Sequence, residues 1–194
     1  MASAKILRPA DEDYFVEPWS ENHLQGDVFA DVPLAIPAPP DAVLVGEKGE
    51  GRFLSGPFEA GLAMLISPSC TLAAQGPSAQ PGTYRLPART LVPIRPVADL
   101  EATGTITEKN IDMLRLDRLR NYFYVPATDR WPESVALLYL PITVHQDVVD
   151  DSRIRQLTGT AFWHLRVKLM AFTGGFVLHP NELGDVPAPT ERTS

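Results

Sequence analysis

Proline is the residue that most limits the folds open to this chain. Nineteen of the 194 residues are proline, and they recur between the apolar segments along most of the sequence. Each proline removes a backbone donor from a strand ladder, so a long parallel sheet tolerates few of them. The sequence therefore predicts many short strands joined by proline-containing turns.

Apolar segments between these turns predict the strands. The segment at 28–36 alternates apolar and polar residues, and Pro33 within it indicates an edge position or a bulge. The continuous apolar run at 62–66 is typical of a buried central strand. Residues 41–60 predict a hairpin or an exposed loop. Further strands are expected at 84–97, 121–125 and 135–144, the last interrupted at Pro141, with a connector at 150–159.

Two helices are expected. Thr105-Ile106-Thr107-Glu108 matches a capping box, so a helix is predicted over about 106–117. The C-terminal helix is the strongest single element, because Phe162, Leu165, Leu169 and Phe172 recur at helical spacing. Thr158 or Thr160 can cap its start, and Gly174-Gly175 its end. This interpretation places His164 and Lys168 on the face opposite the apolar stripe.

These elements predict one mainly β domain with helices, of the α+β class, closed by an amphipathic C-terminal helix. We expect an acidic arm at 1–25, a single domain at 26–176 and a partly flexible tail at 177–194. The arm carries Tyr14, Phe15 and Trp19. Aromatic residues in so polar a stretch indicate that it docks, either on its own domain or on a partner subunit.

Charge and cysteine content exclude several classes. The net charge is −7, and the first sixty residues hold eleven acidic against four basic residues, which disfavours unspecific binding of that part to nucleic acid or anionic membranes. With Cys70 alone, no intramolecular disulfide and no cysteine zinc site can form, and the four histidines lack zinc-site spacing. We expect no metal, no cofactor, no signal peptide, no membrane segment and a cytoplasmic location.

A candidate binding rim follows the central strand. Ser67, Ser69 and Cys70 come directly after it, at a strand end where sites are often built; the alternative is a plain strand exit. A nucleophilic Cys70 would require a neighbouring base. Arg89 and Arg95, which flank the strand core at 91–94, belong to the same candidate rim and could add to a basic groove.

A second candidate is a basic and aromatic patch formed by Arg115, Arg118, Arg120 and Tyr122. Basic residues beside aromatic rings can hold single-stranded RNA through phosphate contacts and stacking. The alternative is a helix exit followed by a strand with its charges in water. His145 two residues before Asp147 could be a general base held by a carboxylate, but the same pattern arises at ordinary strand ends.

The order of elements resembles the PemK/MazF-like toxins. Gly26-Asp27-Val28-Phe29, the strand ending in Ile66-Ser67, and Leu91-Val92-Pro93-Ile94 match short motifs of that family. The resemblance implies a small SH3-like β-barrel with a dimer-forming face. Family ribonucleases carry arginine before the second strand, where this chain has Phe58-Glu59-Ala60-Gly61. They carry Thr or Ser where this chain has Arg95, so no catalytic residue is carried over.

Three functions follow as hypotheses. The first is a non-catalytic MazF-like interaction module that binds a protein partner or a second copy as a homo-oligomer. The second is a divergent RNA-binding protein of the toxin type; if the chain is an enzyme, the resemblance implies an endoribonuclease. The third is a structural subunit of a phage or another large assembly.

Overall fold

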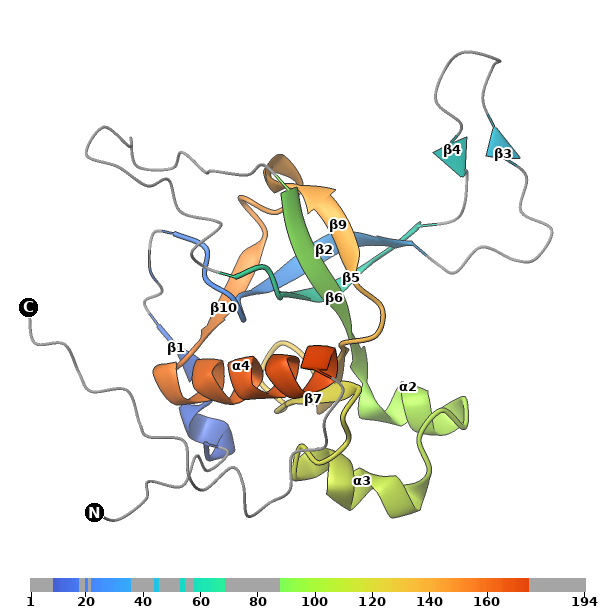
Figure 1. Ribbon diagram of the computed structural model, residues 1–194, viewed down its shortest axis with the longest axis vertical. Coiled ribbons are helices and arrows are strands. Elements are labelled where there is room, and N and C mark those ends of the chain that lie inside the picture. Colours follow the sequence, from blue (N-terminus) through green and yellow to red (C-terminus); the bar gives the residue numbers. More distant parts are fainter. Residues whose placement is uncertain are drawn as a thin grey trace, which may run out of the picture.

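The computed structural model describes residues 9–17, 20, 22–35, 44–45, 53–54, 58–68 and 88–174. Its strands (Figure 1) are β1 (Phe15–Val16), β2 (Val28–Ala35), β3 (Leu44–Val45), β4 (Phe53–Leu54), β5 (Phe58–Leu65), β6 (Ala88–Pro96), β7 (Tyr122–Val125), β8 (Ser134–Leu137), β9 (Ile142–His145) and β10 (Arg153–Leu157). The helices are α2 (Val97–Ala102), α3 (Glu108–Arg115) and α4 (Gly159–Gly174), with 3-10 turns η1 (Asp11–Asp13) and η2 (Gln146–Val148).

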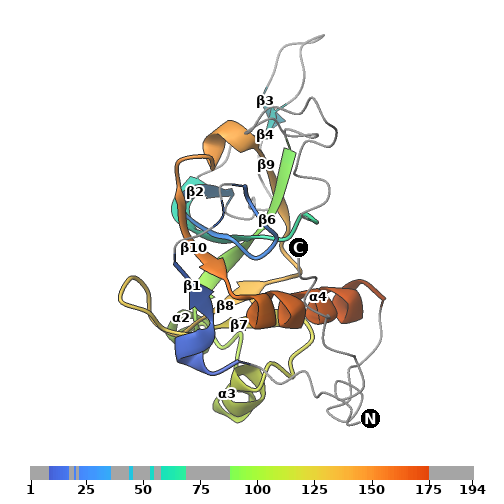
Figure 2. The same ribbon diagram turned by 90° about the vertical axis from the view of Figure 1, so that its left-hand side faces the viewer.

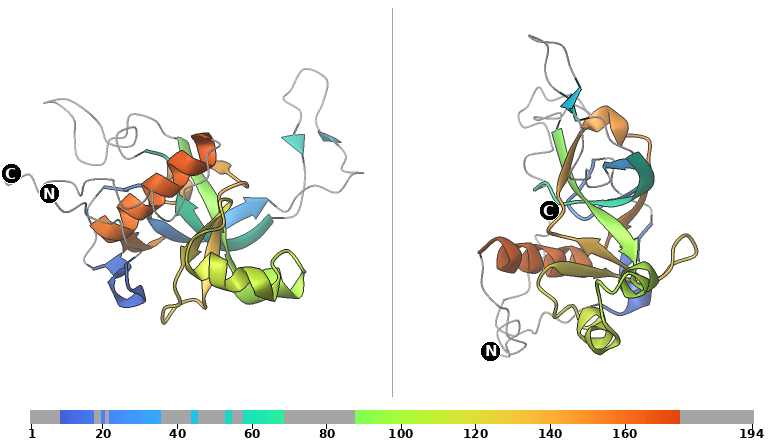
Figure 3. Two further views of the ribbon diagram at one scale, coloured as in Figure 1. Left: turned by 60° about the horizontal axis from the view of Figure 1, so that its bottom comes forward. Right: turned by 90° about the vertical axis from the view of Figure 1, so that its right-hand side faces the viewer.

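One antiparallel sheet forms the body of the protein and curls into a half-barrel. Its strand order is β1-β10-β2-β5-β6-β8-β7, and β9 also pairs with β6. The long strand β6 serves two partners, because β9 pairs with its first half and β8 with its last three residues. The helices gather at one end of the molecule, and α4 lies beside β7 (Figures 2 and 3). The predicted fold class, a mainly β domain of the α+β class with a small barrel-like sheet and helices, is confirmed.

The central strands bury both of their faces. Val28, Met64 and Val92 are register partners across β2, β5 and β6, and all three belong to the core beneath α4. Their neighbours Leu65 and Leu91 pair on the opposite face, in a second core with Phe29, Ala63 and Val149. A strand that is buried on both sides reads as a continuous apolar run, which explains the pattern at 62–66.

The two ends of the sheet meet through side chains. Tyr14, fully buried, donates its hydroxyl hydrogen to the carbonyl of Tyr124 on β7 at 2.9 Å. On the same residue, the backbone N–H of Tyr124 donates to the carboxylate of Asp117 at 3.1 Å. The stretch that was expected to be an irregular arm therefore supplies strand β1 and a core residue. The described residues of this stretch around Tyr14 pack on the rest of the chain.

Several expected elements stand as predicted. The strand at 121–125 forms as β7, and β3 pairs with β4 as a hairpin. The register of β2 shifts between Phe29 and Val32, where Asp31 has a positive φ of 54°, so a bulge precedes Pro33. The hydroxyl oxygen of Thr158 accepts the N–H of Ala161 and caps α4.

Others are corrected. The predicted strand at 135–144 is two strands, because Pro141 separates β8 from β9 and they pair with different halves of β6. Residues Arg153–Leu157 form β10 where a connector was expected, and Val97 begins α2 where a strand was expected. The capping box is wrong: α3 begins after Thr107, which makes no side-chain cap, and the Thr105 hydroxyl lies 2.9 Å from that of Thr103. The tail at 177–194 lies outside the described residues, and the domain boundaries stay predictions.

The buried face of α4 is rotated from the predicted one. Leu165 is fully buried, but Phe162, Leu169 and Phe172 lie only at the margin of the core. His164 and Lys168, which were expected on the opposite face, are buried instead. The reason is electrostatic: the buried carboxylate of Asp117 lies beneath this face, within 3.2 Å of the Lys168 ammonium and 3.4 Å of Nε2 of His164.

Candidate functional site

Two members of the predicted rim, Ser67 and Arg89, are buried and make hydrogen bonds within the chain. The Ser67 hydroxyl oxygen accepts the backbone N–H of Thr90 at 2.8 Å, which ties the end of β5 to β6. Arg89 is fully buried and donates to the side-chain oxygen of Gln146 and to the Ala88 carbonyl, both at 3.2 Å. Ser69 and Cys70 lie outside the described residues, so the rim itself stays a prediction.

Arg95 lies at the other end of β6. It is six positions further along the strand than Arg89, or about 20 Å, so the two guanidinium groups do not share one groove. Arg95 instead makes two hydrogen bonds, of 3.2 and 3.0 Å, to the carboxylate oxygens of Glu59 on β5. The hydrogen bonds to Arg95, and its charge, hold the pKa of Glu59 below its ordinary value.

The predicted basic and aromatic patch divides into two parts. Arg115 faces the Glu133 carboxylate through two hydrogen bonds, of 2.7 and 2.9 Å, and Tyr124 donates its hydroxyl hydrogen to the same group. The Glu133 hydrogen bond and charge raise the pKa of Arg115. Arg118 is exposed after α3. The charge of Arg115 is therefore neutralised by the chain itself.

The other part of the patch joins residues from three segments. Arg120 donates to the carbonyl of Phe172 at 2.8 Å and stands 6.0 Å from its ring. Tyr122 packs edge-on against Tyr139, with ring centroids 5.8 Å apart, and burial, followed by the proximity of Tyr139, raises the pKa of Tyr122. We call Arg120, Tyr122, Tyr139 and Phe172 the aromatic corner. Tyr139 and Phe172 could not be assigned to this patch from the sequence, because nothing local shows that they meet Tyr122 and Arg120.

A buried charge cluster beneath α4 was also missed. The Asp117 carboxylate oxygens lie 3.2 Å from the Lys168 ammonium and 3.4 Å from Nε2 of His164. Lys168 also donates to the Asp117 carbonyl. Asp117 has a positive φ of 56°, a conformation that Asp tolerates better than most residues. The cluster joins α4 to the turn after α3, and all three side chains are buried, so its role is structural.

The Gly26-Asp27 motif of the family resemblance is also structural. Burial raises the pKa of Asp27, while the Leu24 N–H, Gln156 and Arg153 oppose this rise. Arg153 donates to the Asp27 carboxylate at 3.0 Å, and the Gln156 amide does so at the same distance. Buried ion pairs of this kind require such additional hydrogen bonds.

His145 and Asp147 meet as the sequence spacing indicated. The Asp147 carboxylate lies 3.2 Å from Nδ1 of His145, and that nitrogen also accepts the Asp147 backbone N–H, which makes His145 the cap of η2. Both side chains are more than half exposed. The pair therefore lies at the surface of the protein, in contact with water.

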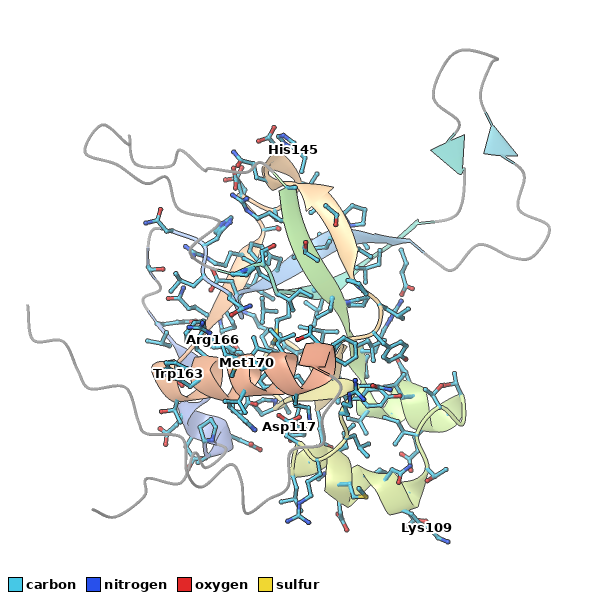
Figure 4. All side chains as sticks on the ribbon, in the orientation of Figure 1. Lys109, Asp117, His145, Trp163, Arg166 and Met170 are labelled. Carbon is cyan, nitrogen blue, oxygen red and sulfur yellow. The ribbon has the colours of Figure 1, made fainter. Side chains whose placement is uncertain are left out.

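The outer face of α4 carries a different arrangement. Figure 4 shows Trp163, Arg166 and Met170 along one side of the helix. The Arg166 guanidinium carbon stands 5.1 Å from the ring of Trp163 and 5.5 Å from that of Phe162. Met170 is 53% exposed. We call Phe162, Trp163, Arg166 and Met170 the α4 face.

Neither a metal centre nor a membrane helix is found in the described part of the chain. Within those residues, no three His, Cys, Asp or Glu side chains gather where they could hold a metal ion. No helix there is long and apolar enough to cross a membrane. A scan against protein-family models finds no match, and a search of the curated proteins finds none either.

Proposed function

We propose that this chain is a non-catalytic interaction module of the PemK/MazF-like kind, which acts through protein–protein contacts. The observation that carries the proposal is that two candidate RNA-binding arginines already face carboxylates of the chain itself. Arg95 and Arg115, which would contact the phosphates of RNA, face Glu59 and Glu133 through paired hydrogen bonds. A phosphate would have to displace a carboxylate that is already well placed, and would meet the repulsion of that carboxylate.

The aromatic corner, whose Tyr139 is exposed and whose Tyr122 and Phe172 are partly buried, supports the same proposal. The aromatic corner combines two tyrosines, a phenylalanine and an arginine, which are residue types enriched in protein interfaces. Leu140 next to it is 39% exposed, as is Tyr139. Such a surface gains free energy when a partner removes it from water.

The edge of the sheet supports a contact through side chains. At β7 the outward N–H and C=O of Tyr124 are bonded to Asp117 and Tyr14. A partner strand would have to break both bonds in order to pair at this residue. The proposed contact therefore involves side-chain surfaces and not the addition of a strand to β7.

Two experiments test the proposal. In the first, the full chain is incubated with total cellular RNA and with a labelled single-stranded RNA. We expect neither cleavage nor binding. RNA loss that Arg95→Ala reduces would support the endoribonuclease hypothesis and overturn the proposal.

The second experiment measures the mass of the full chain by light scattering, and its contacts in the source cell by cross-linking. We expect a specific protein partner or a second copy, with a contact that Tyr139→Ser weakens. Met113→Ser is the matched control, because Met113 is similarly exposed on α3. The proposal would be contradicted if the chain is monomeric and cross-links to no protein, and if neither substitution changes its mass or its cross-linking.

A further inference from the structure

Arg166 is held in place before any partner arrives. Its guanidinium group lies near the rings of Phe162 and Trp163, which are four and three residues earlier on α4. Residues at this spacing are neighbours on a helix surface. A guanidinium over aromatic faces is attracted by their π electrons and loses little further freedom when it binds.

Its hydrogen-bond donors also have no acceptor among the described residues. Within the described part of the chain, Arg166 makes no ion pair and no side-chain hydrogen bond, whereas Arg153 and Arg155 face carboxylates. The helix itself contains no Asp or Glu. An acidic group that approaches the α4 face therefore meets a cation and no acid on that helix.

The chemistry of the α4 face selects one class of ligand. A guanidinium fork binds a carboxylate through two parallel hydrogen bonds. Trp163 and the exposed thioether of Met170 provide an apolar surface for a neighbouring side chain. A nucleic acid would bring many phosphates to a single cation on a chain of net charge −7.

We propose that the α4 face binds an acidic peptide segment of a protein partner. Arg166 grips an Asp or Glu carboxylate, and an adjoining aromatic or aliphatic side chain packs on Trp163 and Met170. This proposal rests on the proposed function, since it names the partner's chemistry and a surface distinct from the aromatic corner.

Selection from a library of displayed random peptides against the full chain tests the proposal. We expect enrichment of Asp or Glu beside Phe, Trp or Leu. For the strongest peptide, Arg166→Gln should weaken binding about tenfold or more, as should the same peptide with its carboxylate changed to an amide. The two changes together should cost little more than either alone. Arg118→Gln, at an exposed arginine after α3, should leave affinity unchanged.

The other outcomes overturn specific statements. Peptides that bind regardless of Arg166 and of their own carboxylate would overturn the α4 assignment and leave the proposed function standing. A single-stranded RNA bound through Arg166, or an oligomer that Arg166→Gln dissociates, would replace the acidic peptide as the occupant. If no peptide is enriched and the cross-linking of the proposed function also fails, both proposals are overturned.

Discussion

The carboxylate of Asp117 and the ammonium of Lys168 lie 3.2 Å apart, both buried, across the contact between α4 and the turn after α3. Their sequence separation is 51 residues. A buried charge is costly unless it is paired, so each side chain makes the burial of the other tolerable.

Asp117→Asn should therefore destabilise the protein strongly. Asparagine also tolerates the positive φ at this position, so the change removes the charge while keeping the backbone. We expect a loss of about 3–5 kcal/mol, because Lys168 remains buried without its counter-charge. Urea unfolding measures the loss.

A control and a rescue accompany this variant. Asp112→Asn, at an exposed position of α3, should change stability by about 0.5 kcal/mol or less. Lys168→Met in the Asp117→Asn background should recover part of the loss, since it removes the stranded charge. Failure of Asp117→Asn to exceed its control would show that the pair contributes little.

Leu165→Ala tests which face of α4 is buried. Leu165 is fully buried, so we expect truncation to cost about 2–5 kcal/mol. Met170→Ala, on the exposed side, should cost about 0.5 kcal/mol or less. Both are measured by chemical denaturation, and equal losses at the two positions would contradict the orientation of the helix.

Gly26→Ala should destabilise through two separable effects. Gly26 has a φ of 97°, and a Cβ there would lie 2.5 Å from Cδ1 of Leu157. Gly104 has a φ of 70° with nothing within 4 Å of an added Cβ, so Gly104→Ala reports the backbone strain alone. That strain is about 1–2 kcal/mol. In thermal unfolding, Gly26→Ala should lose clearly more stability than Gly104→Ala. Equal losses would mean that the Leu157 side chain moves aside without a measurable cost in stability.

His23 should make stability fall as the medium becomes acidic. Burial lowers its pKa from 6.5 to about 4, and the charges of Arg153 and Arg89 act in the same direction. As the pH falls, the unfolded chain therefore binds a proton at His23 before the folded chain does. The contribution of His23 to the free energy of unfolding is complete above pH 6.5 and is lost as the pH falls towards 4. Two nearby carboxyl groups, Asp150 (3.9 Å from Nδ1 of His23) and Asp27, have raised pKa values. Their titration changes the free energy of unfolding with pH in the opposite direction.

The comparison of wild type with His23→Gln isolates this contribution. As the pH falls from 6.5 to 4, the urea midpoint should fall more steeply in the wild type than in His23→Gln, because only the wild type gains a proton at residue 23 on unfolding. Parallel curves would mean that His23 titrates normally in the folded protein.

The sequence predicts local periodicity well and long-range pairing poorly. The central strand at 62–66 and the helix containing Leu165 are visible, because their apolar spacing depends on local geometry alone. The position of Lys168 was predicted wrongly, since its burial depends on Asp117, which lies far away in the sequence. Arg95 was placed in a binding groove for the same reason: its partner Glu59 belongs to another strand. Periodicity shows where apolar residues recur but not which charges meet.

The bonds of Tyr124 to Tyr14 and Asp117 affect how the protein behaves when crowded. An open sheet margin is a template on which further chains can polymerise into fibrils. At Tyr124 that template is already occupied by the chain's own side chains, one from near the N-terminus and one from beside the buried lysine. The same two residues that complete the fold thus also protect concentrated solutions of it from strand-templated growth at this point of the sheet.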